Sequence, residues 1–220
     1  MLTQDLLNHS IPQLGLQDNV GKAKQLINDF KLTHLPVVSG KQFLGLISEE
    51  DLLDIEEDKI KIDKVREFFQ LAFIQDDLHF LEAVNFCNRM ECNTVPVLNK
   101  QNEYLGIITA TQLLKTMSDF NGTSEPGGLI VMETERVHFS ISEISRIVES
   151  NDCTMLQLNT STDNTSGIIR ITIRVNRTDI HSLISTFERF EYQIICHFGE
   201  KQSDDKTDSN YKNLIRYLNV

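Results

Sequence analysis

One stretch of this chain is present twice, and the duplication constrains the fold more than any single residue. The first copy contains Pro36 and Gly45, and the second contains Pro96 and Gly106 in matching contexts. The prolines are 60 positions apart and the glycines 61, so the second copy has one additional residue between these points. A solenoid needs about three or more repeats, so two copies predict a two-lobed module with pseudo-twofold symmetry.

Each copy has the same predicted order of elements. An amphipathic stretch comes first, followed by a β-rich hairpin and a second, short helix. Asp18 and Asp76 precede the amphipathic stretches and are candidate N-caps, whereas Ser48 and Thr109 are candidate caps of the short helices. The apolar positions of the amphipathic stretches are Val20, Ala23, Leu26, Ile27 and Phe30 in the first copy, and Leu78, Leu81, Val84, Phe86 and Met90 in the second.

The second half of the chain has a different pattern. Residues 121–128 are small and polar with two glycines after a proline, which predicts a linker. The segment beyond them predicts the order β-α-β-β-α-β, the ferredoxin-like split arrangement, so the fold class is α+β. The predicted domains are repeat one at residues 1–57, repeat two at 58–120, the linker at 121–128, the ferredoxin-like domain at 129–199, and a mobile tail with a short helix at 200–220.

Charge and composition exclude several classes of function. The formal net charge is −11, so no basic field is available to release counterions from nucleic acid, and such a partner is not expected. The first residues show neither a basic segment nor a long apolar core, and no apolar run of about 18 residues occurs. We therefore expect a cytoplasmic protein without a membrane partner. The four cysteines lack C-x-x-C spacing and are interpreted as small buried apolar residues in a reducing compartment, not as metal ligands.

The duplicated half resembles a tandem pair of cystathionine-β-synthase (CBS) domains, a Bateman module. The resemblance rests on Leu-Pro-Val at residues 35–37, Val-Pro-Val at 95–97, and the pattern Gly-h-h-[Ser/Thr]-x-x-Asp at 45–51, where h is hydrophobic. It covers roughly residues 1–117. The second half is similar to an ACT domain, a small regulatory βαββαβ fold, through its element order. The order CBS–CBS–ACT resembles the acetoin-utilization-type family of small cytoplasmic proteins, for which a regulatory role is implied.

The resemblance implies a nucleotide site at the motif. In CBS pairs that bind adenosine nucleotides, the motif Asp accepts hydrogen bonds from the ribose, and the Ser/Thr hydroxyl and helix start bind phosphate. Ser48 and Asp51 match this pattern; an ionised carboxylate suits a vicinal diol, and a helix start suits an anion. In the second copy Thr109 matches, but Gln112 replaces the Asp and offers no charge assistance. The alternative is that Ser48 and Asp51 only form a helix capping box.

Further candidates surround the motif. The apolar residues near Pro36 and Pro96 would hold a base, with polar edges from Thr33, His34, Asn93 and Thr94. For His34 we favour the alternative of a packing or surface residue over a phosphate contact. Nearby basic residues are limited to Lys22, Lys31 and Lys115, which favours AMP or ADP over ATP. The full set of candidate ligand-binding residues is Thr33, His34, Pro36, Gly45, Ser48, Asp51, Thr94, Pro96, Thr109 and Gln112.

These features predict a non-enzymatic regulatory protein. No P-loop, nucleophile elbow, zinc-protease or dinucleotide motif is present. The ACT-like half has no glycine over residues 133–139, where amino-acid-binding members usually carry Asp-x-x-Gly, so we interpret it as a dimerisation domain. We therefore expect a homodimer that requires no cofactor and senses AMP, ADP or ATP in the CBS cleft. The alternative is a structural adaptor with empty clefts that recruits a partner protein, whose identity the sequence does not give.

Overall fold

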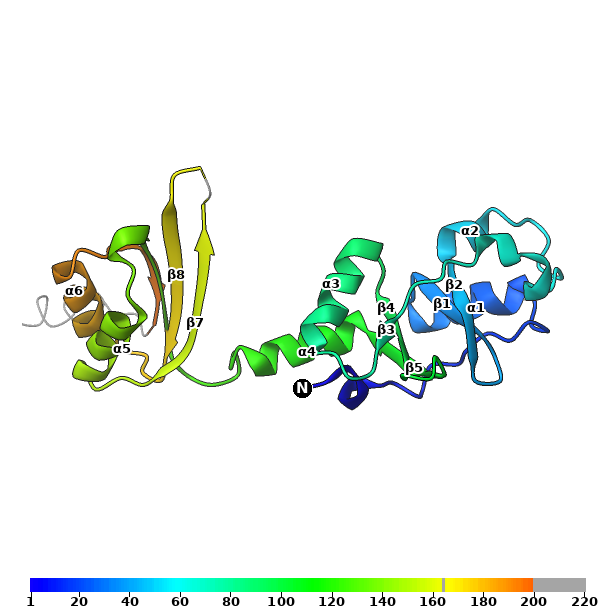
Figure 1. Ribbon diagram of the computed structural model, residues 1–220, viewed down its shortest axis with the longest axis horizontal. Coiled ribbons are helices and arrows are strands. Elements are labelled where there is room, and N and C mark those ends of the chain that lie inside the picture. The colour runs from blue at the N-terminus through cyan, green and yellow to red at the C-terminus, as the bar shows by residue number, and fades with distance from the viewer. Residues whose placement is uncertain (164, 200–220) are drawn as a thin grey trace, which may run out of the picture. The chain divides into compact units, whose positions relative to one another are not determined.

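The chain folds into two compact units that divide between Met117 and Ser118 (Figure 1). The structure is a computed structural model and describes residues 1–163 and 165–199. The predicted tail helix within residues 200–220 lies outside the described residues. Within the described ranges, no helix has both the length and the apolar character needed to cross a membrane.

The first unit consists of the two sequence repeats, and the predicted order of helix, hairpin and second helix is confirmed in both. The structure adds 3-10 helices and the short strand β3, which the sequence patterns did not predict. The first repeat and its connector contain η1 (Thr3–Leu6), α1 (Val20–Phe30), β1 (His34–Ser39), β2 (Gln42–Ser48), α2 (Glu49–Leu53), η2 (Ile62–Lys64) and η3 (Arg66–Phe68). The second repeat contains β3 (Ile74–Gln75), α3 (Phe80–Met90), β4 (Thr94–Leu98), β5 (Tyr104–Thr109) and α4 (Ala110–Phe120).

The predicted N-caps of α1 and α3 are wrong. Asn19 caps α1, because its side chain accepts a hydrogen bond of 2.8 Å from a backbone N–H in the first turn. The carboxylate of Asp18 instead accepts from the backbone N–H of Gly15 at 2.8 Å, within the loop that precedes the helix. In the second repeat the N-cap position belongs to His79, three residues beyond Asp76.

The buried face of α3 also differs from the predicted one. Phe80, Ala83 and Phe86 are buried, whereas Leu78 and Leu81 are each 37% exposed. Apolar residues occupy adjacent positions in this stretch, so more than one face satisfies the helical period. Packing against the rest of the unit decides which face is buried.

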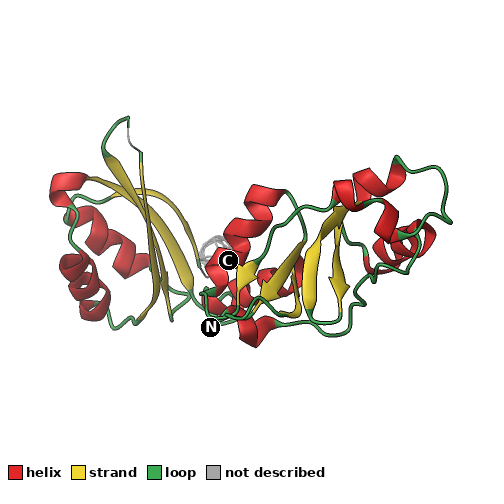
Figure 2. Cartoon of the chain, turned by 45° about the vertical axis from the view of Figure 1, so that its right-hand side comes forward, coloured by secondary structure: helices red, strands yellow, loops and turns green. Residues whose placement is uncertain are grey.

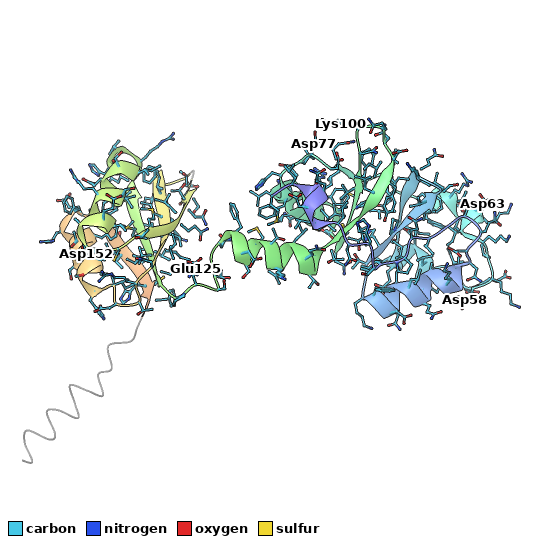
Figure 3. All side chains as sticks on the ribbon, turned by 90° about the horizontal axis from the view of Figure 1, so that it is seen from below. Asp58, Asp63, Asp77, Lys100, Glu125 and Asp152 are labelled. Atoms are coloured by element: carbon cyan, nitrogen blue, oxygen red, sulfur yellow. The ribbon has the colours of Figure 1, made fainter. Side chains whose placement is uncertain are left out.

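The hairpins of the two repeats are built alike. β1 pairs with β2 in antiparallel fashion, and β4 pairs in the same way with β5. β3 adds a parallel strand next to β4, and in the first repeat a single parallel bridge between Leu14 and Val37 takes the corresponding place. An ion pair of 2.9 Å between Lys100 and Asp77 joins the β4–β5 turn to the loop before α3 (Figure 3).

Each repeat sends a segment across to the other. Asn8, which precedes the first repeat's helix, bridges Ile107 in β5, and its backbone N–H donates to the Ile107 carbonyl at 2.7 Å. Gln70, which precedes the second repeat's helix, bridges Leu46 in β2 through two hydrogen bonds of 2.8 Å. The two repeats therefore exchange segments and form one module, not two lobes connected by a tether.

Gly45 lies where a crossing segment approaches β2 most closely. Its φ is +152°, and a Cβ atom at this position would lie 2.9 Å from Phe69 Cβ and 3.2 Å from the Gln70 carbonyl. Gly106 occupies the equivalent position in β5 with a φ of +154°, but there a Cβ would meet nothing closer than 3.5 Å. Gly45 is thus required by the contact between the repeats as well as by its backbone conformation.

The cores of the two repeats meet at the hairpins. One cluster surrounds α1 and β1, and a second surrounds α3 and β4 but also contains Leu6, Val38, Phe43 and Leu46 from the first repeat. Phe43 stacks on Tyr104, with ring centroids 6.1 Å apart and an interplanar angle of 10°. These two aromatic residues occupy equivalent positions in the repeat, so they meet near its pseudo-twofold axis.

The second unit confirms the predicted order β-α-β-β-α-β. Its sheet is antiparallel with the strand order β7-β8-β6-β9, and α5 and α6 cover one face (Figure 2). The core between helices and sheet includes Ile130, Ile171, Leu183 and Phe187. The elements are β6 (Gly128–Glu135), η4 (Arg136–His138), α5 (Ile141–Ser150), β7 (Met155–Thr162), β8 (Ile168–Val175), α6 (His181–Arg189) and β9 (Gln193–Phe198).

Gly128, predicted as the last linker residue, is instead the first residue of β6. A Cβ atom here would lie 2.5 Å from Ile180 Cγ2 and 2.9 Å from the Arg177 carbonyl. Close packing therefore explains this glycine, which the sequence interpretation attributed to linker flexibility.

The contact at Gly45 leads to a stability prediction. Gly45→Ala and Gly106→Ala both place an alanine at an unfavourable positive φ, but only Gly45→Ala also forces the crossing segment away. We expect Gly45→Ala to lower the free energy of unfolding by about 1–3 kcal/mol more than Gly106→Ala. Urea unfolding followed by circular dichroism measures this difference, and equal losses in the two variants would contradict the proposed contact.

Candidate functional site

A cavity of about 320 Å³ lies at the motif of the first repeat. The first repeat contributes the start of β1 and the start of α2 to this cavity. The second repeat contributes Gln70 of the crossing segment and the end of α3. Both repeats therefore contribute to its wall. The lining residues are Thr33, His34, Ser48, Glu49, Glu50, Asp51, Gln70, Met90 and Glu91.

The cavity brings together four of the ten predicted site residues: Thr33, His34, Ser48 and Asp51. The other six lie elsewhere. Pro36 is buried inside β1, and Gly45 packs against the crossing segment. The remaining four, Thr94, Pro96, Thr109 and Gln112, belong to the second repeat.

Ser48 and Asp51 are bonded to each other as a helix cap. Ser48 Oγ accepts from the backbone N–H of Asp51 at 3.0 Å and donates to Asp51 Oδ2 at 2.5 Å. This geometry is the capping arrangement that the sequence left as an alternative. Over the part of the chain that the structure describes, Asp51 Oδ1 has no protein hydrogen bond, so one carboxylate oxygen is available to a ligand while the cap stays intact.

His34 is a buried residue in the wall of the cavity. Its exposed fraction is 9%, and its Nδ1 lies 3.0 Å from the Thr33 hydroxyl. Burial lowers the pKa of the imidazole, and the charges of Asp51 and Glu50 offset part of this effect. His34 is therefore neutral at neutral pH and offers a polar edge, not a positive charge, to a ligand.

Thr33 and Asn93 join the two repeats by a reciprocal pair of hydrogen bonds. Asn93 Oδ1 accepts from the Thr33 backbone N–H at 2.9 Å, and Thr33 Oγ1 accepts from the Asn93 backbone N–H at 3.0 Å. Asn93 also donates through Nδ2 to the Lys31 carbonyl at 2.8 Å. The two residues are 60 positions apart and hence equivalent in the repeat. Sequence reasoning assigned them to a base edge, and only the structure shows that they meet.

The cavity is acidic. Glu49, Glu50, Asp51 and Glu91 line it, and its lining contains no lysine or arginine. None of the basic residues considered from the sequence, Lys22, Lys31 and Lys115, lines the cavity, and Lys22 is paired with Asp18 at 2.7 Å. Each additional ligand phosphate would meet this negative field, so the lining suits a nucleoside group better than a polyphosphate.

The equivalent position in the second repeat is a plain helix start. Thr109 Oγ1 accepts from the backbone N–H of Gln112 at 3.3 Å, which caps α4. Thr94 is fully buried, and its hydroxyl donates to Asn93 Oδ1 at 3.2 Å. The structure thus uses the second copy's polar residues for capping and for the contact between the repeats.

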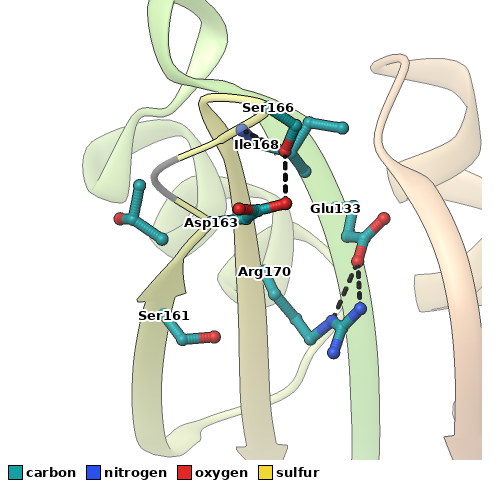
Figure 4. Close-up of a pocket in the computed structure, with 7 residues that line it drawn as sticks. Glu133, Ser161, Asp163, Ser166, Ile168 and Arg170 are labelled. Carbon is teal, nitrogen blue, oxygen red and sulfur yellow. Dashed lines mark hydrogen bonds and ion pairs between the residues drawn. The ribbon is translucent and has the colours of Figure 1, made fainter.

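The second unit has a separate, open cavity of about 630 Å³ beside the β7–β8 hairpin (Figure 4). Its charged residues are engaged with their neighbours: Arg170 contacts Glu133 Oε1 through Nε at 2.8 Å and through a terminal nitrogen at 2.6 Å, and Asp163 accepts from Ser166 at 2.8 Å. Among the described residues, no group of three or more His, Cys, Asp and Glu side chains is placed to hold a metal ion.

A family model described as the CBS domain matches residues 4–58 and 66–119. The first unit is a tandem pair of CBS domains. A relative of this chain is the inosine-5'-monophosphate dehydrogenase of Methanocaldococcus jannaschii, which is 31% identical over 103 residues. That match covers 44% of this chain but only 20% of the enzyme, so it does not establish a catalytic activity for this chain.

Solved structures with a similar fold include other CBS proteins. A CBS domain pair/ACT domain protein from Thermotoga maritima has a TM-score of 0.49 and 15% identity, covering 55% of this chain and 98% of that one. An acetoin utilization (AcuB) protein from Vibrio cholerae has a TM-score of 0.48 and 19% identity, covering 56% and 95%. CBSX2, solved in complex with AMP, has a TM-score of 0.46 and 17% identity, covering 54% and 97%.

The contact between Thr33 and Asn93 generates a prediction about the CBS pair. Asn93→Ala leaves the Thr33 backbone N–H without its acceptor, so we expect it to lower the free energy of unfolding by about 2–3 kcal/mol. The Thr33 hydroxyl also donates to Asn93 Oδ1 at 3.2 Å, so Thr33→Ala combined with Asn93→Ala should cost about 1 kcal/mol less than the sum of the single changes. Urea unfolding of the four proteins measures this coupling.

A matched control uses Asn99, whose side chain bonds within the β4–β5 turn. Thr33→Ala and Asn99→Ala share no hydrogen-bond partner, so their effects should add. Additive losses for Thr33 and Asn93 as well would show that the Thr33 and Asn93 side chains do not bond to each other across the repeats.

Proposed function

We propose that this chain is a non-enzymatic regulatory protein that senses an adenine nucleotide in the CBS cleft of the first repeat. The observation that carries the proposal is the cavity at Ser48 and Asp51, to which both repeats contribute. A ligand there would contact the first repeat and, through Gln70 and Glu91, the second. Binding would stabilise one arrangement of the two repeats over others, which is how a ligand shifts a conformational equilibrium.

In this proposal Asp51 holds the ribose through the carboxylate oxygen that the cap leaves available. A carboxylate can accept bonds from both hydroxyls of a vicinal diol, and an ionised acceptor makes the stronger hydrogen bond. Thr33 and His34 provide the polar edge of the site, and Met90 provides an apolar surface. The intact motif of the first repeat and the Gln112 substitution in the second favour one ligand per chain.

The acidic lining sets the order of preference among nucleotides. Because four carboxylates surround the cavity, we propose AMP as a better ligand than ADP, and ADP as a better one than ATP. An additional charge near such a surface costs about 1 kcal/mol, which is roughly fivefold in affinity. The same reasoning makes S-adenosylmethionine, which carries a positive charge, a ligand to be compared with AMP.

We further propose that the second unit is an ACT-type domain that holds the protein as a cytoplasmic homodimer, as in the acetoin-utilization-type family. Its βαββαβ order and strand order support this assignment. The face of its sheet opposite the helices carries Leu129, Val131, Cys196 and Phe198 in register on β6 and β9. Phe198 is 63% exposed, and such a face is suited to a second copy of the chain.

A second candidate function is a structural adaptor that binds no nucleotide and recruits a partner protein. The observation in its favour is that the Ser48–Asp51 pair already serves as a complete helix cap. A thermal unfolding midpoint that does not respond to nucleotides, together with a co-purifying protein, would favour this function over sensing.

Calorimetric titration tests nucleotide sensing. We expect heat with AMP at about one ligand per chain, and Asp51→Asn should weaken binding roughly tenfold, because it removes the charged acceptor while keeping the side chain's size. The matched control is Gln112→Ala, the equivalent position in the second repeat, which should leave the affinity unchanged. Absence of heat with AMP, ADP, ATP and S-adenosylmethionine would remove the sensing proposal.

The dimer proposal has its own test. Phe198→Glu places a charge on the open sheet face and should convert the dimer to a monomer in light scattering coupled to gel filtration. Val137→Glu is the control, because Val137 is 81% exposed but lies in η4, outside the sheet. A monomeric wild-type protein, or a dimer that survives Phe198→Glu, would refute an interface at this face.

A further inference from the structure

The end of α3 brings two cysteines together. Glu91 follows the helix in a left-handed conformation, with φ 49° and ψ 38°, and its backbone N–H donates to the Cys87 carbonyl. The backbone N–H of Cys92 donates to the same carbonyl at 3.1 Å. A helix end of this kind, a Schellman motif, places the side chains of the first and last of these residues in contact. Cys92 accordingly belongs to the apolar cluster around α3 and β4, and Cys87 packs against the same cluster.

The first repeat shows that this helix end does not require cysteine. Lys31 ends α1 with φ 53° and ψ 45°, and the Leu32 backbone N–H donates to the Ile27 carbonyl at 3.0 Å. Ile27 and Leu32 are 3% and 4% exposed, so the same two positions form an ordinary apolar contact there. In the second repeat both residues of the pair carry thiols instead.

The two thiols differ in their surroundings. Cys92 is buried, with its sulfur 3.2 Å from the Thr94 carbonyl, whereas Cys87 is half-buried and gives access from solvent. The neighbouring Cys87 thiol lowers the pKa of Cys92 to about 7, and the Cys92 thiol together with burial raises the pKa of Cys87. Of the two thiols Cys92 has the lower pKa, and the thiolate is the reactive form.

We propose that Cys87 and Cys92 are a redox-active pair that closes to a reversible disulfide on reaction with hydrogen peroxide or a similar small peroxide. The Cys92 thiolate attacks the O–O bond, gains one oxygen as a sulfenic acid, and releases hydroxide that is protonated to water. The Cys87 sulfur then attacks the Cys92 sulfur, and the S–O bond breaks. One disulfide and two waters form from two thiols and one peroxide, so the step balances.

The disulfide would act on the wall of the cavity in the first repeat. Met90 and Glu91, which line that cavity, lie between the two cysteines in the chain, and Asn93 of the contact between repeats follows directly. Closing the ring restricts the backbone of this segment. The proposal itself rests on the helix end alone and stands whether or not the cavity binds a nucleotide.

Mass spectrometry of the reduced, full-length protein tests the proposal. Treatment with equimolar hydrogen peroxide at neutral pH should remove two hydrogen atoms from the intact mass, and dithiothreitol should restore them. Peptide mapping without reduction should locate the bond between Cys87 and Cys92. The same bond should form when Cys153→Ser and Cys196→Ser are combined, since these cysteines lie in the second unit.

Single variants test the order of the two steps. Cys87→Ser should leave a sulfenic acid on Cys92 that dimedone traps, whereas Cys92→Ser should give several-fold less adduct on Cys87. Circular dichroism checks that each serine variant folds, and disulfide mapping of the wild-type protein tests the pair independently of these variants. Thiols that stay reduced in the wild-type protein, or bonds that involve Cys153 or Cys196 instead, would overturn the proposal.

Discussion

The exchange of segments between the two repeats is the constraint on which the rest of the first unit depends. The residues before each repeat's helix pair with the second strand of the other repeat, at Asn8 with Ile107 and at Gln70 with Leu46. Neither repeat can complete its sheet alone, so the unit folds and is stabilised as a whole. The closeness of this contact explains why Gly45 has no side chain, and it places Gln70 in the wall of the cavity.

Polar residues near the pseudo-twofold axis serve packing before they serve a ligand. Thr33 and Asn93 satisfy each other's backbone N–H groups, and Ser48 satisfies the first turn of α2. A buried polar group without a partner is costly, so these bonds must be present with or without a ligand. What remains for recognition is one oxygen of Asp51, the neutral ring of His34 and the acidic rim. A regulatory ligand would therefore act by adding contacts to a preformed module.

Local patterns predicted the elements well, and they failed where neighbours in space decide. The duplicated motif gave the helices, the hairpins and the Ser48 cap, because each depends on residues close in sequence. Asp18 was assigned to a cap but bonds within a loop, and the buried face of α3 was misjudged because adjacent apolar residues allow two faces. The sequence patterns treat Cys87 and Cys92 as independent apolar residues. They miss the contact between the two because it arises from the left-handed residue that ends α3.

The repeat offset and its motifs alone predicted that the first half is a CBS pair and that only the first copy carries a complete motif. Alternation and helical periodicity, which are local properties, predicted the βαββαβ order of the second half. Only the tertiary structure decided which residues meet: the crossing of segments, the pairing of Thr33 with Asn93, and the acidic cavity shared by both repeats. These contacts join residues between 24 and 99 positions apart, and no local preference encodes such pairings.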